Sequence, residues 1–241
     1  MNKIIQDQLR EIEEQNNVKI LYAIESGSRG WGFESKDSDF DVRFIYVHPI
    51  EWYLNVFEGS DIIEIPVDKV LDINGWDLRK AMGLMYKSNA PLLEWLSSPI
   101  IYKQNQEFIK DLRYIAEKYF SPVSVTYHYI NIAKKSFSGL LDMDKVKLLK
   151  HAMHLIRLLV MGTEILNIHQ INTYRTEEHD LLMDIRKGKY SYDELFKMVE
   201  LYEFKFKQAS LSTTLPEEPD KKKVEELLIS LYEDYYNNSK K

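Results

Sequence analysis

Hydrophobic positions in the first half of the chain change period several times, which predicts helices mixed with strands. The first segment has apolar residues at near-helical spacing, namely Ile4, Ile5, Leu9 and Ile12. The apolar run VKILYAI that follows predicts a short buried strand, and it leads into a glycine-rich turn. Residues 40–47 (FDVRFIYV) alternate between apolar and charged side chains, which is typical of a strand with one face toward a core. We therefore expect the chain to begin with a helix, a strand, a turn and a second strand.

Two further segments before residue 100 favour a β-hairpin. DIIEIP and KVLDIN are both rich in strand-forming residues, and they flank Val67 and Asp68. We place the turn at these two residues. A helix is then predicted from Asp77 to about Tyr86.

After about residue 100 the apolar spacing becomes helical. One helix is marked by Phe108, Leu112, Ile115 and Tyr119. The pair Ser121-Pro122 is typical of a helix start, and a longer helix is expected from about Lys145. These patterns predict an α+β fold, with a mixed sheet and helices in residues 1–105 and a helical domain in residues 106–241.

Composition narrows the class of protein. The 241 residues contain no cysteine and carry a formal net charge of −6. Disulfides and thiolate metal sites are therefore excluded, and any metal must bind carboxylates, imidazoles or water. The charged amphipathic N-terminus and the lack of a long apolar run predict a cytoplasmic protein that does not enter a membrane.

The stretch ESGSRGWGFESKDSDFDVRF, residues 25–44, carries the candidate chemistry. Asp39 and Asp41 are two positions apart on a predicted strand, so their side chains share one face. Paired carboxylates of this kind suit Mg²⁺, and two such ions can activate phosphoryl or nucleotidyl transfer. Gly27 and Ser28 come directly after the first strand, where glycine lets backbone N–H groups approach a polyphosphate.

A third carboxylate would complete such a site. Asp72 is the preferred candidate, because it lies in an otherwise apolar strand pattern where a buried charge would need a cation. Glu64 in DIIEIP is the alternative, and the spacing does not choose between them.

The motif GSRGWGFESKDSDFDVR resembles the signature of the DNA polymerase β-like nucleotidyltransferase superfamily. The segments GSRGWGF, SDFDVRFIYV, EWYL, LDINGWDLRKA and LLEWLSSPI look more narrowly like the YcgL-type, RNA-repair-pathway nucleotidyltransferases. These segments span residues 25–100, and YFSPVSVTYHY extends the likeness to about residue 129.

The resemblance implies a polymerase-β-like catalytic domain followed by the helical domain. It implies that Gly27 and Ser28 hold the triphosphate, and that Asp39, Asp41 and Asp72 bind metal and act in catalysis. Two Mg²⁺ ions are expected, with Mn²⁺ as a substitute. The substrate would be an NTP, ATP being favoured, and the acceptor an RNA end, with a protein or a small molecule as alternatives.

Arginine and lysine residues are further candidates for phosphate contacts. Arg43 shares the face of the two aspartates and could clamp a phosphate or neutralise them, and Arg29 could contact phosphate or solvent. A stripe on the long helix, Lys147, Lys150, His151, His154 and Arg157, could face the cleft or simply face solvent. From this stripe we choose Lys150 and Arg157 as nucleotide contacts.

A module that binds nucleotide without turnover is the alternative from a different functional class. The four tryptophans could stack a base, although packing in the core is their more common use. The oligomeric state is not encoded in any pattern that we find.

Overall fold

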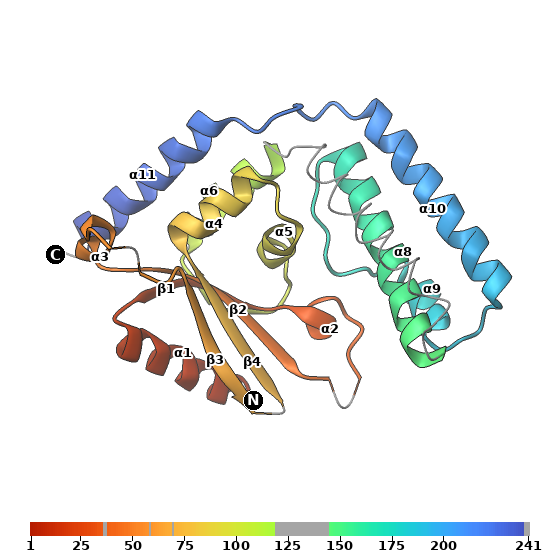
Figure 1. Cartoon of the computed structure of the whole chain (residues 1–241), viewed down its shortest axis with the longest axis horizontal. Helices are drawn as coiled ribbons and strands as arrows, with labels where there is room; N and C mark the ends of the chain where they lie inside the picture. Colours follow the sequence, from red (N-terminus) through yellow and green to blue (C-terminus); the bar gives the residue numbers. More distant parts are fainter. Residues whose placement is uncertain (36–37, 58, 69, 119–144, 239–241) are drawn as a thin grey trace.

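A computed structural model describes residues 1–35, 38–57, 59–68, 70–118 and 145–238. In this part of the chain, strands β1 to β5 form one sheet in the order β3-β4-β2-β1-β5 (Figure 1). Their bounds are Lys19–Glu25, Phe40–Val47, Ile62–Asp68, Leu71–Asp77 and Ile101–Gln104. Strands β2 and β4 run parallel, whereas the other neighbouring pairs are antiparallel.

Helix α1 (Asn2–Asn16) covers one face of the sheet (Figure 1). Its buried residues Ile5, Leu9 and Ile12 pack in one cluster with Val42 and Phe44 of β2. The alternation of β2 thus places its even-numbered residues under α1 and its odd-numbered residues on the opposite face. That opposite face carries the charged positions of the motif.

Helices from the rest of the front half cover the second face of the sheet. They are α4 (Leu78–Tyr86) and α5 (Ala90–Leu96), while the short α3 (Ile50–Leu54) follows β2. Asp77 caps α4 by accepting the N–H of Arg79 at 2.8 Å, and Asn89 caps α5 in the same way. The Asp77 cap marks where α4 leaves β4, and the Asn89 cap marks where α5 begins after α4.

The back half is helical, as the sequence predicts. Its helices are α6 (Gln106–Lys118), α8 (Lys145–Ile168), α9 (His179–Arg186), α10 (Tyr192–Ser212) and α11 (Lys221–Asn238). Helix α10 packs along α8, and α11 returns to contact α4 and α6 (Figure 1). One hydrophobic cluster runs from β1 and β2 through α5 into α8 and α11. The expected boundary at residue 105 falls between β5 and α6, and this core continues across it.

The α+β class is confirmed, with three local differences. The hairpin of β3 and β4 forms, but Val67 and Asp68 still belong to β3, so the chain turns later. The residues just before the expected boundary at residue 105 form the edge strand β5, which pairs with β1. The expected Gly-Ser turn is a short helix, α2 (Gly27–Gly30). The predicted positions Tyr119 and Ser121-Pro122 lie outside the described residues.

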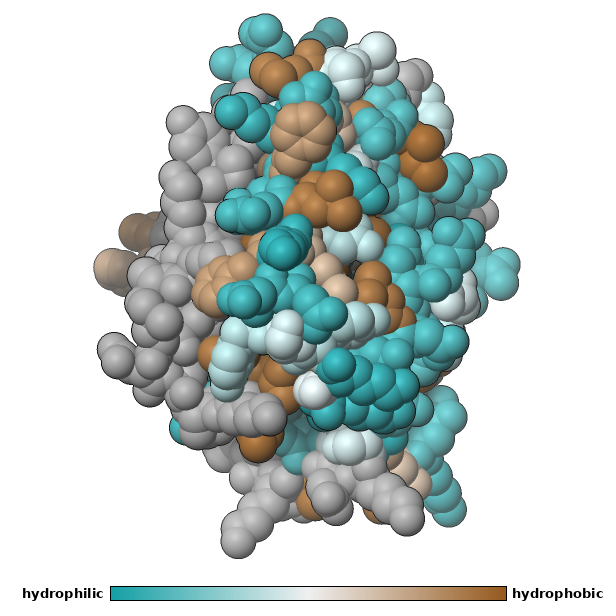
Figure 2. Space-filling view, turned by 90° about the vertical axis from the view of Figure 1, so that its right-hand side faces the viewer, coloured by the Kyte–Doolittle hydropathy of each residue, from teal (hydrophilic) through white to brown (hydrophobic). Residues whose placement is uncertain are grey.

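In the described ranges, no helix has both the length and the apolar composition needed to cross a membrane. Figure 2 shows the face that lies to the right in Figure 1, where α10 runs. Hydrophilic side chains cover most of its coloured part, and hydrophobic ones are scattered among them.

Candidate active site

Glycine is required where β1 passes into α2. Gly27 has a φ of +58°, in the left-handed region that side chains disfavour. A Cβ atom at this position would lie 1.9 Å from Oδ2 of Asp41. The absence of a side chain therefore lets the backbone of the Gly-Ser segment lie directly against a candidate metal ligand.

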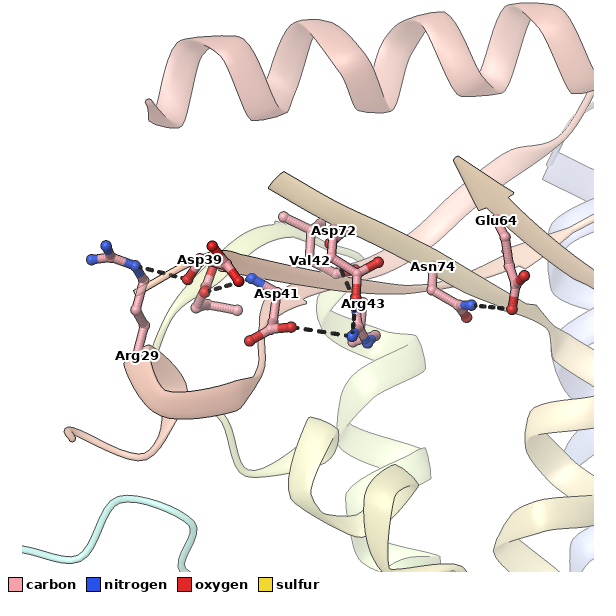
Figure 3. A network of polar contacts seen from close by, with 9 residues as sticks. Arg29, Asp39, Asp41, Val42, Arg43, Glu64, Asp72 and Asn74 are labelled. Carbon is pink, nitrogen blue, oxygen red and sulfur yellow. Dashed lines mark hydrogen bonds and ion pairs between the residues drawn. The ribbon is translucent and has the colours of Figure 1, made fainter. Parts of the chain in front are cut away.

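Asp41 and Asp72 are neighbours across the sheet. Asp39 lies immediately before β2, and Asp41 is the second residue of that strand. In the parallel pairing of β2 with β4, Asp41 is the register partner of Asp72 (Figure 3). Because register partners in a parallel ladder share a face, Asp41 and Asp72 present their carboxylates on the same side of the sheet.

Arg43 lies between two of these carboxylates (Figure 3). Its Nη2 donates to Oδ1 of Asp41 at 3.3 Å and to Oδ2 of Asp72 at 2.8 Å. Its Nη1 donates to the carbonyls of Val42 and Asp72 at 3.0 and 3.2 Å. Of the two roles expected for Arg43, neutralising the aspartates is the one that these contacts display.

The third carboxylate is less buried than expected. The side chain of Asp72 is 43% exposed and is paired with Arg43, so it is not an isolated charge in an apolar strand. Glu64 lies on β3, one strand further from β2, and accepts a hydrogen bond from Asn74 at 2.8 Å (Figure 3). The position of Asp72 next to Asp41 favours it over Glu64.

The electrostatic environment of Asp41 would favour a bound cation. Burial raises the pKa of Asp41, and the like charges of Asp72 and Asp39 raise it further, whereas Arg43 lowers it. A divalent cation would offset both the burial and the repulsion. This balance is typical of a carboxylate that binds metal.

Glu25, the last residue of β1, supports Asp41 from the neighbouring strand, and the sequence analysis did not identify it. Glu25 is fully buried and accepts the backbone N–H of Asp41 at 2.9 Å and the hydroxyl of Tyr102 at 2.5 Å. Burial raises its pKa, and these two hydrogen bonds partly offset the rise. The only sequence signal is a charged residue at the end of an apolar strand, which is also a common surface pattern.

A cavity of about 500 Å³ opens beside these groups. The front half contributes Gly27, Ser28, Asp39 and Asp41 to its wall, and the helical half contributes Lys150 and Arg186. A volume of several hundred Å³ suits one small-molecule ligand. The cavity thus combines carboxylates, the Gly-Ser segment and the three cations Arg43, Lys150 and Arg186.

Comparisons with known proteins identify the family of the chain. A sequence model of the RNA repair pathway DNA polymerase beta family, RlaP, matches residues 1–230. The chain belongs to this family. The family resemblance predicted from the motifs is therefore confirmed.

Two individual proteins are also similar to this RlaP-family chain. It is 48% identical over 151 residues to the uncharacterized protein YcgL of Bacillus subtilis (strain 168). That match covers 63% of this chain and 58% of the relative, so the chain spans less than two thirds of the relative's length. A crystal structure of a nucleotidyltransferase-like protein from Exiguobacterium sibiricum 255-15 aligns with 86% of this chain and 75% of its own, at 11% identity and a TM-score of 0.32.

The arginines predicted to contact phosphate lie in different environments in the structure of this RlaP-family chain. Arg29 donates to the carbonyls of Asp39 and Ser38, at 3.1 and 2.8 Å, so it braces the loop before β2. Arg157 is only 2% exposed, and its guanidinium carbon lies 3.9 Å from the centre of the Trp31 ring. The structure therefore separates Arg157 from the exposed Lys150, although both belong to the predicted stripe.

The basic stripe does not form one uniform face. Lys147 and Lys150 are exposed, whereas His154 packs edge-on against Trp31 at a centroid distance of 5.2 Å. Burial, followed by the nearby cations Arg157 and Lys150, lowers the pKa of His154 to about 3. His154 is therefore neutral at physiological pH and contributes no charge to the cavity.

Arg186 is a cavity residue that the sequence analysis missed. It ends α9 and donates to the carbonyl of Phe33 at 2.6 Å. No local pattern distinguishes it from the other basic residues of the chain, because only the packing of α9 brings it to the Gly-Ser segment.

Among the residues that the structure describes, no three histidine, aspartate or glutamate side chains are grouped closely enough to hold a metal ion as they stand. Asp39 and Asp41 nevertheless open into one cavity, and carboxylate oxygens are the ligands that Mg²⁺ prefers. The cavity therefore offers the type of donor atom that a divalent ion needs.

Proposed function

We propose that this protein is a Mg²⁺-dependent nucleotidyltransferase. It would transfer a nucleoside monophosphate from an NTP, with ATP favoured, to an acceptor hydroxyl at an RNA end. The observation that carries the proposal is the pairing of Asp41 with Asp72 beside Gly27, in a chain of the polymerase beta family. The RNA acceptor is supported by the family's description as part of an RNA repair pathway.

The triphosphate would lie in the cavity between the two halves. Gly27 and Ser28 line this cavity and would offer backbone N–H groups to the phosphates, and Lys150 and Arg186 supply positive charge from the helical side. Neutral His154, the half-buried Trp31 and the buried Phe33 border the same space, which would give the nucleoside an apolar surface. The cavity can therefore accept a nucleotide with its phosphates toward the Gly-Ser segment.

Asp39, Asp41 and Asp72 would hold two Mg²⁺ ions, for which Mn²⁺ can substitute. Such ions, when bound, polarise the phosphate and stabilise the charge of the leaving pyrophosphate. Asp72, whose side chain is 43% exposed, would accept the proton of the attacking hydroxyl, and Arg43 holds it beside Asp41. The acceptor oxygen forms a bond to the α-phosphorus as the bond to the β-phosphate oxygen breaks.

The test is label transfer with a matched control. Wild type, the double variant Asp39→Ala/Asp41→Ala and the surface variant Asp193→Ala are each incubated with Mg²⁺ and one α-³²P-NTP at a time. RNA and protein pools serve as separate acceptors. Wild type and Asp193→Ala should label RNA, and the double variant should be slower by roughly a hundredfold or more, because it lacks the charges that stabilise the transition state.

The other outcomes identify the alternatives. Label on protein would establish a protein-modifying enzyme, and label on neither pool with retained NTP binding would indicate a nucleotide-binding module or a small-molecule acceptor. Full activity in the double variant would exclude the proposed site.

A further inference from the structure

A second cavity of about 500 Å³ adjoins the first and shares Ser26, Trp31 and Arg43 with it. We call it the tryptophan cavity. Its other principal wall residues are Glu64, Asn74, Trp76, Glu94, Trp95 and Arg157. It comes from β3, β4, α5 and α8, so both halves of the chain build it. Its volume again suits one small ligand or one part of a larger one.

Aromatic rings form much of this wall. Trp76 of β4 stacks on Trp95 of α5 with ring centroids 3.9 Å apart and an angle of 26° between the planes. Trp95 is buried, whereas Trp76 is half-buried and lies at the surface of the stack. An aromatic stack that ends at a cavity is a platform on which a nucleobase can continue the stacking.

Each arginine of the tryptophan cavity faces a carboxylate of the protein, although Nε and Nη1 of the buried Arg157 have no hydrogen-bond partner among the described residues. Arg157 donates to Glu94 at 3.4 Å and lies over Trp31, and Arg43 is held by the aspartates on its strand and on β4. A phosphate entering here would meet cations that already face carboxylates, and it would also meet the acidic side chains of Glu64 and Glu94. The balance of charge favours a flat, uncharged polar group over an anion.

Hydrogen-bonding capacity is concentrated on one side of this cavity. Asn74 donates to Oε1 of Glu64 at 2.8 Å, and Glu64 is exposed (Figure 3). A carboxylate and an amide oxygen each accept more than one hydrogen bond. The pair therefore suits a ligand that donates hydrogen bonds, such as the exocyclic amino group of adenine, cytosine or guanine.

We propose that the tryptophan cavity binds the terminal nucleoside of the acceptor RNA, with its base beside Trp76 and its amino group toward Glu64 and Asn74. This inference rests on the proposed function. A transfer between two substrates needs two adjoining sites, and the first cavity holds the Gly-Ser segment and the cations that suit the triphosphate. Since the attacking hydroxyl must approach from the side opposite the leaving pyrophosphate, the second substrate belongs in the adjoining cavity.

Direct binding tests this assignment without any turnover. The probes are two RNA trinucleotides with free 3′ hydroxyls, one ending in adenosine and one ending in uridine, added in the absence of NTP. Binding of Mg²⁺-ATP is measured separately on the same proteins. The variants are Glu64→Gln and Trp76→Leu, and the matched control is Glu14→Gln, which changes an exposed carboxylate on α1 across the sheet. Circular dichroism confirms that each variant is folded.

Wild type should bind the adenosine-ended probe more tightly than the uridine-ended one. Glu64→Gln should lower the affinity for the adenosine-ended probe about tenfold, since it removes a charged hydrogen-bond acceptor. The affinity for the uridine-ended probe should stay unchanged. Trp76→Leu should lower the affinity for both probes by about tenfold, because stacking does not depend on the identity of the base. Affinity for Mg²⁺-ATP should stay at the wild-type value in all three variants.

Three results would overturn the assignment. In the first, wild type binds neither RNA probe, and in the second, both cavity variants bind both probes as tightly as wild type does. In the third result, the cavity variants lose affinity for ATP and keep their affinity for the RNA probes. The last result would place the base of the NTP in the tryptophan cavity. Failure of the proposed function is separate, because it is measured as label transfer by Asp39→Ala/Asp41→Ala and not as probe binding.

Discussion

Replacing Gly27 with alanine is the sharpest test of the link between the Gly-Ser segment and the carboxylates. The backbone at Gly27 has a φ of +58°, and a left-handed conformation costs a non-glycine residue about 1–2 kcal/mol. The new Cβ would also lie 1.9 Å from Oδ2 and 2.7 Å from Cγ of Asp41. The carboxylate must rotate away, at a further cost of about 0.5–1.5 kcal/mol if it leaves a preferred rotamer.

The unfolded state offsets part of this cost. Alanine restricts the unfolded chain relative to glycine, which returns about 0.4–1 kcal/mol. We therefore expect Gly27→Ala to lower the free energy of unfolding by about 1–2 kcal/mol. Because the displaced group is a proposed metal ligand, affinity for Mg²⁺-ATP should fall as well, by about tenfold or more.

Gly83 provides a matched control. It is exposed within α4, and a Cβ built there meets no atom within 4 Å. Gly83→Ala should raise the free energy of unfolding by about 0.5–1 kcal/mol and leave nucleotide binding unchanged. Urea unfolding and ATP titration of both variants make the comparison. Equal gains in stability for the two variants, with ATP binding intact in both, would refute the reasoning about Gly27.

Three other perturbations test the surroundings of the site. Glu25→Ala should lower the free energy of unfolding in urea by about 2–5 kcal/mol, because the N–H of Asp41 and the hydroxyl of Tyr102 lose a buried acceptor. Glu25→Gln keeps an acceptor oxygen and should cost clearly less. Equal losses of stability in the two variants would contradict this reasoning. Burial raises the pKa of the Asp77 carboxyl above its ordinary value of 3.8. Between the ordinary and the raised pKa, the folded chain therefore binds more protons than the unfolded chain. The free energy of unfolding of wild type, relative to that of Asp77→Asn, should fall as pH rises through the raised pKa. A difference that does not vary in unfolding curves from pH 3 upward would argue against that shift. Arg186→Ala should raise the KM for NTP about tenfold in initial-rate assays, since it removes a cation from the cavity, and an unchanged KM would place the phosphates elsewhere.

Local patterns in the sequence predicted much of the fold. The spacing of Ile5, Leu9 and Ile12 gave the buried face of α1, and the alternation in FDVRFIYV gave the two faces of β2. Both properties depend on periods of 3.6 and 2 residues, which neighbouring residues fix on their own. The same period placed Asp39 and Asp41 together before any partner strand was known. Their role in catalysis stays a prediction.

Long-range packing decided what the patterns left open. The parallel register of β2 with β4 chose Asp72 over Glu64 as the neighbour of Asp41, and this pairing joins residues far apart in the chain. Long-range packing also separates the residues of the predicted basic stripe on α8. Arg157 pairs with Glu94, 63 residues away in the chain, and is buried. A charge can be buried only with such a partner, and helical spacing does not encode it.

The sequence by itself thus determined the family, the order of most elements and the motif that carries the carboxylates. Only the tertiary structure placed Glu25 against the backbone N–H of Asp41 and brought Arg186 to the cavity that the Gly-Ser segment lines. It also formed the tryptophan cavity beside that first cavity. The reason is physical: side-chain periodicity is a property of neighbouring residues, whereas a cavity and the pairing of its charges arise only when distant segments pack together.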